Sequence, residues 1–356
     1  MRHLLDIVDM SVSELDELLL LATDIIDNPD AYRERCKYKK LATLFFEPST
    51  RTRLSFETAM IDLGGSVVGF ESGGSSSASK GESVRDTAAV VGGYVDIIAM
   101  RHPFEGAAIA ASQFSPVPVI NAGDGGHCHP TQTLADLLTI KREVGRLDNL
   151  TIGFCGDLRY GRTVHSLINA MVRYAGNKFV LISPEELTLP EYVTAMLDDL
   201  KIEYSVENKL ETAMPKLDVL YMTRIQRERF ENDSLYDAVA GKFILTKEIM
   251  QSAKPDMRVL HPLPRVDEIS VQVDTDKRAA YFRQTYYGKI MRMALIIKLL
   301  DSVNEEPVKT REWRVTDKEC SNGKCITFRE NDNVPYSYIA GDGTERCAYC
   351  DHILDK

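Results

Sequence analysis

The chain has 356 residues, of which 44% are hydrophobic, and a formal net charge of −10 at pH 7. This length allows a large core and predicts two or more domains. The acidic balance argues against a nucleic-acid partner, because phosphate backbones are bound by positive surfaces. No apolar run approaches the roughly 20 residues of a membrane span, and the acidic N-terminus does not resemble a signal peptide, so we expect a cytoplasmic protein without a membrane partner.

The first predicted elements are a helix and then a strand-turn-helix unit. Ser11-Val12-Ser13-Glu14 fits a capping box, and an apolar face at helical spacing follows it. The apolar run at residues 41–46 predicts a short buried strand, which Pro48 ends. From Thr52 onward apolar residues recur at helical spacing until Gly64-Gly65, so the strand leads through a tight turn into a helix.

This turn places hydroxyl and guanidinium groups where the first helical N–H groups have no partner inside the helix. The helix dipole is positive at the same point, so the turn is suited to binding an anion. The simpler alternative is that Ser49 or Thr50 only caps the helix and the arginines lie in solvent. Two arginines in one turn, Arg51 and Arg53, favour a phosphate site.

Strand and helix patterns then alternate. Short apolar runs at residues 66–70, 95–100 and 117–120 are separated by helical patterns at residues 84–91 and 107–114. This order predicts a parallel sheet with helices on both faces. In such a fold ligands bind beyond the carboxyl ends of the strands.

The loops after these strands carry the candidate polar groups. Arg101 directly follows one strand. The serine-rich loop 72–82 is a plain linker by composition. Lys80 near the end of this loop would also suit a lid that closes on an anion. His127-Cys128-His129 invites a metal site. We reject that interpretation because adjacent residues rarely converge on one ion. His129 is better explained as a strand-end group that faces a ligand, or as a structural histidine.

A second β-α series begins at Leu150, with strands predicted at residues 151–155, 178–182, 202–206, 218–222 and 258–260. Its first loop lacks the G-x-G-x-x-G pattern, so a dinucleotide is poorly supported. Arg162, Arg224 and Gln226 together would suit a small substrate with more than one carboxylate, because guanidinium pairs bidentately with carboxylate. Taken singly, each arginine is better explained by a surface ion pair. A long helix without proline is predicted from residue 284 to about residue 303.

The composition changes after residue 304, where four of the seven cysteines fall within 31 residues as Cys320-x4-Cys325 and Cys347-x2-Cys350. Two such pairs fit tetrahedral zinc with four thiolates. Disulfides are the alternative, and a cytoplasmic location disfavours them. The tail is too short for a large core, so the metal would supply much of its folding free energy. The scattered cysteines are interpreted as inert: Cys36, Cys128 and Cys155.

The polar motifs, in their order along residues 1–304, resemble the signature of the carbamoyltransferases. They are Ser49-Thr50-Arg51-Thr52-Arg53 with Ser55-Phe56-Glu57, His129-Pro130-Thr131-Gln132, Asp157 to Arg162, and His261-Pro262-Leu263-Pro264. Within that family Pro262 points to the aspartate enzymes, since the ornithine enzymes typically carry a cysteine there. The resemblance implies two doubly wound parallel-sheet domains joined by long helices, an α/β fold. We expect a carbamoyl-phosphate domain at residues 1–135, completed by a helix at 285–304, and an aspartate domain at residues 136–284.

The resemblance also implies a role for each motif residue. The phosphate of carbamoyl phosphate would be held by Ser49, Thr50, Arg51 and Thr52. Its carbonyl oxygen would be surrounded by Thr52, Arg101 and His129. The carbamoyl amino group would contact Gln132 and the backbone at Pro262 and Leu263. The two carboxylates of L-aspartate would be held by Arg162, Arg224 and Gln226.

The family's mobile loop corresponds here to Ser76 and Lys80, and it reaches the active site of a neighbouring subunit, so a homotrimer is implied. Some members have two adjacent lysines where this chain has Ser79-Lys80, so the role rests on Lys80 alone. The tail at residues 305–356 resembles the small zinc-binding β domain of the family's separate regulatory chain. In the regulatory chain a nucleotide-binding domain precedes the zinc domain, and the segment before Cys320 is too short to hold one here. The role that the resemblance still implies for the tail is contact between chains in a larger assembly.

The implied reaction makes N-carbamoyl-L-aspartate and phosphate in pyrimidine synthesis. The amine of aspartate attacks the carbonyl carbon, and preorganised donors stabilise the charge on the carbonyl oxygen and the departing phosphate. Orientation of two small anions would supply much of the acceleration, without a side-chain nucleophile or a catalytic cofactor. The alternatives are a carbamoyltransferase for another amino acid and a catalytically silent assembly subunit. The intact set of arginines, with Lys80 and His129, argues against the latter.

Overall fold

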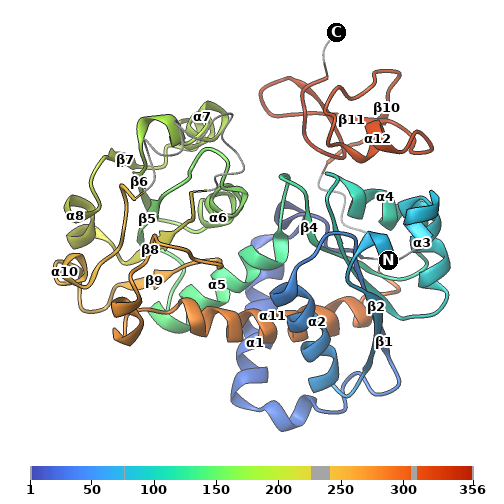
Figure 1. The fold of residues 1–356 in the computed structure, drawn as a ribbon, viewed down its shortest axis with the longest axis horizontal. Coiled ribbons are helices and arrows are strands. Elements are labelled where there is room, and N and C mark those ends of the chain that lie inside the picture. The colour runs from blue at the N-terminus through green and yellow to red at the C-terminus, as the bar shows by residue number, and fades with distance from the viewer. Residues whose placement is uncertain (1, 76, 226–240, 306–310, 355–356) are drawn as a thin grey trace. The chain divides into compact units, whose positions relative to one another are not determined.

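The structure is a computed structural model that describes residues 2–75, 77–225, 241–305 and 311–354 (Figure 1). The chain divides into two compact units, residues 1–131 with 289–356 and residues 132–288. Each unit is built on a parallel sheet, and the tail forms a small antiparallel sheet, so the predicted fold class is confirmed. Among the described residues, no helix combines the length and the apolar character needed to cross a membrane.

The first unit contains a four-stranded parallel sheet in the order β2-β1-β3-β4. Its strands are β1 (Lys40–Phe45), β2 (Ser66–Phe70), β3 (Ile97–His102) and β4 (Val119–Asp124). Strands β3 and β4 are buried along their whole length, as are the last five residues of β1, which explains their continuous apolar runs. The carboxyl ends of these three neighbouring strands therefore open at one edge of the sheet.

Helices accompany this sheet, and two of them begin at a serine whose side chain accepts a hydrogen bond from the helix. They are α1 (Val12–Asp27), α2 (Thr50–Asp62), α3 (Val84–Gly92) and α4 (Ala107–Phe114). The capping box is confirmed, since Ser11 Oγ accepts from the Glu14 N–H at 3.2 Å and Glu14 Oε2 accepts from the Ser11 N–H at 2.8 Å. The apolar face of α1 is buried, with Leu15, Leu18, Leu19, Ala22 and Ile25.

Strands β3 and β4 both begin two residues later than predicted and continue into polar residues. The ladder continues because those polar groups find buried partners: Asn121 Nδ2 donates to Leu5 O at 3.0 Å and to Asp124 Oδ1 at 3.1 Å. The long helix α11 (Tyr281–Asp301) likewise begins three residues before its predicted start. The apolar pattern therefore located the core of each element better than its ends.

The second unit contains a five-stranded parallel sheet in the order β7-β6-β5-β8-β9. Its strands are β5 (Thr151–Cys155), β6 (Lys178–Ile182), β7 (Tyr204–Glu207), β8 (Val219–Met222) and β9 (Arg258–Leu260). The helices between them are α6 (Arg162–Met171), α7 (Glu191–Asp199), α8 (Leu210–Ala213) and α10 (Lys247–Met250). Helices α5 (Pro130–Val144) and α11 each contribute residues to both units, so long helices join them as predicted.

The tail belongs to the first unit. It contains β10 (Arg314–Val315), β11 (Tyr336–Ile339) and β12 (Glu345–Cys347), with the short helix α12 (Ile326–Arg329). The Glu105 N–H donates to Lys324 O at 2.8 Å, and the Ile326 N–H donates to Glu105 O at 2.9 Å. Tyr349 and the four paired cysteines share one apolar cluster with the alanines of α4. The tail therefore buries apolar side chains by docking on α4, and this burial adds to the folding free energy that a metal would supply.

Gly106 provides a test of this docking. It caps α4 with a φ of +80°, and a Cβ added there would lie 2.5 Å from Tyr349 Cβ and 2.6 Å from Tyr349 O. Gly145 has a similar φ of +89° but no atom within 4 Å of its added Cβ. We expect Gly145→Ala to cost about 1 kcal/mol of backbone strain, and Gly106→Ala to add about 1–3 kcal/mol of overpacking. Urea unfolding and limited proteolysis of the tail check this, and equal effects of the two variants would contradict it.

Candidate active site

The first part of the site is the turn between β1 and α2. Ser49 occupies the N-cap position of α2, yet its side chain accepts no hydrogen bond from the helix. The alternative that the Ser49 hydroxyl only caps the helix is therefore wrong, because that hydroxyl makes no capping hydrogen bond. Thr50, Arg51 and Thr52 form the first helical turn behind it, and Thr52 is buried. The turn thus combines hydroxyl groups with the positive end of a helix.

Arg101, near the carboxyl end of β3, lies beside this turn. It is 9% exposed, and its Nη2 donates to Glu47 Oε1 at 2.8 Å. Its backbone oxygen accepts from the Phe46 N–H at 2.8 Å, which ties the two strand ends together. Partial burial, together with the nearby charge of Arg101, lowers the pKa of Arg51. The two guanidinium groups therefore repel each other, and an anion between them would relieve that repulsion.

His129 joins Arg101 from the end of β4. Gly123 has a φ of +121°, and a Cβ there would lie 2.7 Å from Arg101 Nη1 and 3.5 Å from His129 Cδ2. The missing side chain lets both groups pack against the strand. His129 is buried, and its Nδ1 lies 3.4 Å from Thr131 Oγ1. The carboxyl edge of the first sheet therefore gathers the predicted residues Ser49 to Thr52, Arg101 and His129.

Arg292 was not identified from the sequence. It is buried on α11, where its Nη1 donates to Ser55 Oγ at 3.1 Å and its Nη2 to Thr131 Oγ1 at 3.4 Å. Its guanidinium also lies over the Phe56 ring, 5.1 Å from the centroid. The position of Arg292 among the apolar residues Ile290, Met291 and Met293 was the available signal. Arg292 therefore links helix α2, through Ser55, to Thr131, which contacts His129.

The loop predicted as a linker or lid is only partly described. Its described residues form two short 3-10 turns, Gly73–Ser75 and Ser77–Lys80. Lys80 is exposed at the end of the second turn. Ser76 lies outside the described residues.

In the second unit, Arg162 and Arg224 lie at one edge of the sheet. Arg162 begins α6 after β5, and Arg224 follows β8, which is paired in parallel with β5. Thr223 Oγ1 accepts from the Asp157 N–H at 2.9 Å, so the loops after these two strands contact each other. Both arginines are partly buried. Gln226 lies outside the described residues.

The remaining predicted groups of this unit share one network around Asp136. Gln132 Nε2 and Gln284 Nε2 both donate to Asp136 Oδ1, at 2.7 and 2.6 Å, and the Tyr221 hydroxyl donates to Oδ2 at 2.9 Å. Gln284 Oε1 in turn accepts from the His261 N–H at 2.9 Å. The fully buried Asp136 was missed from the sequence, although its place one turn after Gln132 was a signal. It orients Gln132 and, through Gln284, the loop that begins at His261.

His261 shapes the loop that carries Pro262 and Leu263. Its Nδ1 accepts from the Leu263 N–H at 2.8 Å, and its Nε2 lies 2.7 Å from Glu268 Oε1. This arrangement fixes the imidazole with its proton on Nε2. Leu263 has a φ of +55°, an unusual conformation for a branched residue that the histidine contact holds in place.

Glu268→Gln is expected to destabilise the second unit most at neutral pH. Glu268 also accepts from the Val266 and Asp267 N–H groups, at 3.0 and 3.1 Å. Burial alone would raise its pKa, but the hydrogen bond from His261 and the backbone N–H groups outweigh burial and hold the pKa below the ordinary 4.5. A lowered folded pKa gives stability that is present above the unfolded pKa and is lost as the pH falls through the folded pKa.

We therefore expect Glu268→Gln to lower the free energy of unfolding by about 1–3 kcal/mol at neutral pH, because a charged acceptor is lost from a buried site. The difference from the parent chain should shrink as the pH falls below about 4. Urea unfolding at both pH values measures it, with the exposed Asp267→Asn as the matched control. A difference that does not change with pH would contradict the argument.

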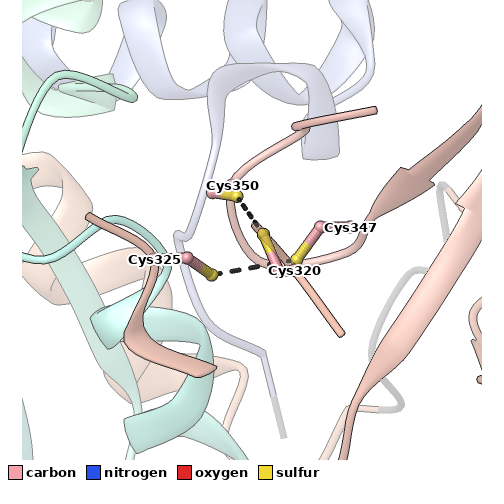
Figure 2. A group of neighbouring side chains, drawn as sticks. All are labelled: Cys320, Cys325, Cys347 and Cys350. Atoms are coloured by element: carbon pink, nitrogen blue, oxygen red, sulfur yellow. Dashed lines mark hydrogen bonds between the residues drawn. The ribbon is translucent and has the colours of Figure 1, made fainter. Parts of the chain in front are cut away.

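The four tail cysteines form a separate site. Figure 2 shows their side chains converging, with Cys320 Sγ 3.6 Å from Cys350 Sγ and Cys325 Sγ 3.8 Å from Cys347 Sγ. All four sulfurs lie within 4.8 Å of one another and are buried. These distances are too long for disulfides, which need about 2.05 Å. A tetrahedral ion with metal–sulfur bonds of about 2.3 Å places its sulfurs about 3.8 Å apart, so the site fits a metal ion.

The other cysteines differ from this group. Asp124, His127 and Cys128 do lie together, with their potential ligand atoms within 4.8 Å, although His129 is not part of that group. Burial raises the pKa of Cys128 well above its ordinary value, which keeps it as a thiol and makes it a poor ligand. Burial likewise raises the pKa of Cys36, to about 11, and that of Cys155. Their interpretation as inert thiols agrees with these shifts.

Two family models match the chain in succession. Residues 2–142 match the carbamoyl-phosphate-binding domain of the aspartate/ornithine carbamoyltransferases, and residues 148–299 match the aspartate/ornithine-binding domain. The tail lies beyond both matches.

Curated relatives and solved structures agree with the family models. The aspartate carbamoyltransferase catalytic subunit of Lachnoclostridium phytofermentans is 62% identical over 307 residues, which are 86% of this chain and 100% of the relative. That of Clostridium novyi is 58% identical over 84% of this chain and 98% of the relative. The catalytic subunit of M. jannaschii aspartate transcarbamoylase superposes with a TM-score of 0.81 at 45% identity, covering 86% of this chain and 100% of that one. Aspartate transcarbamoylase from Trypanosoma cruzi, in complex with N-(phosphonacetyl)-L-aspartic acid, superposes with a TM-score of 0.78 at 39% identity, covering 84% of this chain and 95% of that one.

Proposed function

Because this chain belongs to the aspartate/ornithine carbamoyltransferase family, we propose that it transfers the carbamoyl group of carbamoyl phosphate to L-aspartate in pyrimidine synthesis. The observation that carries the proposal is the carboxyl edge of the first sheet, where the hydroxyl-rich helix start lies beside Arg101 and His129. The named relatives, at about 60% identity, support aspartate as the acceptor.

The proposed roles follow from the chemistry of these groups. Ser49, Thr50, Arg51 and Thr52 would hold the phosphate, where the helix N–H groups and the guanidinium stabilise its charge. Arg101 and His129, with Thr52, would donate to the carbonyl oxygen as the aspartate amine attacks the carbonyl carbon. The departing phosphate can accept the amine proton. Every bond that forms or breaks then involves the two substrates, and the protein supplies orientation and charge stabilisation.

The second unit would supply the acceptor site. Arg162 and Arg224 lie at the ends of adjacent strands and suit the two carboxylates of L-aspartate, with Gln226 as a third contact. Gln132 and the backbone at Pro262 and Leu263 would contact the carbamoyl amino group, and the Asp136 network orients them. We assign residues 1–135 with helix 285–304 to the carbamoyl-phosphate domain and residues 136–284 to the aspartate domain.

The assembly and the metal are part of the same proposal. Zinc would bind Cys320, Cys325, Cys347 and Cys350, since four thiolates are the donor set of structural zinc sites. Lys80 and Ser76 would complete the active site of a neighbouring subunit in a homotrimer, and the tail would mediate further contacts. We place the enzyme in the cytoplasm, where thiols stay reduced, which suits seven cysteines without a disulfide.

The direct test incubates the purified full-length chain with carbamoyl phosphate and L-aspartate and measures N-carbamoyl-L-aspartate. A panel of other amino acids, including L-ornithine, is assayed in parallel. We expect product with L-aspartate only. Product with another amino acid would reassign the acceptor, and no product with any of them would favour a silent assembly subunit.

A further inference from the structure

His127 lies between two carboxylates from distant parts of the first unit. Its Nδ1 is 3.0 Å from Asp124 Oδ2, and its Nε2 is 3.2 Å from Asp351 Oδ2 in the tail. The histidine side chain is only 11% exposed. A neutral imidazole has one N–H, so both contacts are hydrogen bonds only when the ring is an imidazolium. Burial alone would lower the pKa of His127, but Asp124 and the other neighbouring groups outweigh burial and raise it well above the ordinary value.

Asp124 organises the turn that leads to His129. Its backbone N–H donates to Cys128 O at 3.3 Å, and its Oδ1 accepts from the Cys128 N–H at 3.1 Å. Its Oδ2 also accepts from the Gly106 N–H at 2.8 Å. The turn is therefore closed on the side chain of Asp124 and is followed at once by His129. A change in the contact between His127 and Asp124 would therefore alter the turn that leads directly into His129.

Asp351 is held firmly from the tail side. Its Oδ1 accepts from Arg311 Nη1 at 2.8 Å and from the Tyr338 hydroxyl at 2.9 Å, which leaves Oδ2 for His127. Its backbone N–H donates to Cys347 O at 3.0 Å, and it directly follows Cys350. Asp351 has a φ of +60°, which Asp and Asn tolerate better than other residues with a side chain. The fold of the tail therefore determines where this carboxylate lies.

We propose that Asp351 is a positioning residue, whose carboxylate holds His127 against Asp124 and so fixes the turn that carries His129 into the active site. The tail then tunes catalysis within its own chain without contributing a group that touches substrate. This inference rests on the proposed function, because His129 is the group being positioned.

The test compares Asp351→Asn, His127→Gln and the double variant in the full-length protein. Asparagine keeps the shape and the backbone conformation but removes the charge. We expect Asp351→Asn to lower kcat by about tenfold or more, because small displacements of a reacting group are costly. The KM for L-aspartate and the zinc content should stay at their parent values. The melting temperature should fall, because Arg311 and Tyr338 lose a buried charged acceptor, so kcat is measured well below the melting temperature of every variant. The double variant should be no slower than the slower single variant, because both substitutions remove the same ion pair.

Asp342→Asn is the matched control, since it removes one carboxylate from the tail that pairs only locally, with Thr344 and Arg346 among the described contacts. It should keep the parent kcat. Three results would each overturn this inference while leaving the proposed function intact. They are a parent kcat in Asp351→Asn, losses of kcat that multiply in the double variant, and a loss of zinc together with the loss of activity. An inactive parent chain would instead overturn the proposed function, and this inference with it.

Discussion

Replacing Arg101 by alanine is expected to lower kcat by about 10²–10³-fold, the usual cost of removing one preorganised donor to a developing oxyanion. Arg101 is the most buried of the arginines at the carboxyl edge of the first sheet, and its Nε has no hydrogen-bond partner among the described residues. A donor held in this way loses little by reorganisation when charge develops near it. Steady-state kinetics with carbamoyl phosphate and L-aspartate would measure the loss.

The fold should tolerate this change better than the reaction does. The partner left behind, Glu47, has a side chain that is 36% exposed, so water can replace the lost ion pair. Arg33→Ala is the matched control, because Arg33 pairs with Asp30 on an exposed surface. It should keep the parent kcat. If Arg101→Ala were to raise only the KM for carbamoyl phosphate and leave kcat unchanged, Arg101 would stabilise the ground state and the transition state equally and would not be a specific donor to the developing oxyanion.

The sequence predicted the elements best where an apolar run meets a glycine or a turn. The ends of β5, β6 and β9 agree with their predicted bounds. Strand β4 extends past its apolar run, because Asn121 continues the strand with the Leu5 carbonyl as a partner more than a hundred residues away. Local periodicity carries no information on such a partner, so strand ends at a ligand edge are the hardest to place.

In the candidate site too, residues in local motifs were predicted, and residues with distant partners were missed. Ser49 to Thr52, Arg101 and His129 stand in short motifs, and parallel-sheet logic places them at one edge without further information. Asp136 and Gln284 are 148 residues apart, and Arg292 is 237 residues from Ser55. Their roles depend on which helices pack together, and the residue pattern does not specify that. For the same reason the sequence predicts only that a metal supplies much of the tail's folding free energy, whereas the tail also shares an apolar cluster with α4.

Cys347→Ser is expected to abolish metal binding and to unfold the tail. Four thiolates hold a structural zinc ion with about 10–16 kcal/mol of apparent free energy in small domains, so removal of one ligand outweighs any other single contact in the tail. Cys347 also begins the Cys347-x2-Cys350 pair, and its backbone oxygen accepts from the Asp351 N–H. Metal analysis should give about one zinc per chain for the parent and much less for the variant.

The consequences should be confined to the tail and to the contacts it makes. The first 300 or so residues match relatives over almost their whole length, so both sheets should keep their fold without it. Loss of the tail would expose the alanine-rich face of α4, and we expect a changed particle size by sizing chromatography. Cys36→Ala is the matched control, since it removes a buried thiol far along the chain and should keep the zinc and the particle size. Unchanged zinc content and size in Cys347→Ser would mean that the cysteine cluster neither binds the metal nor organises the assembly.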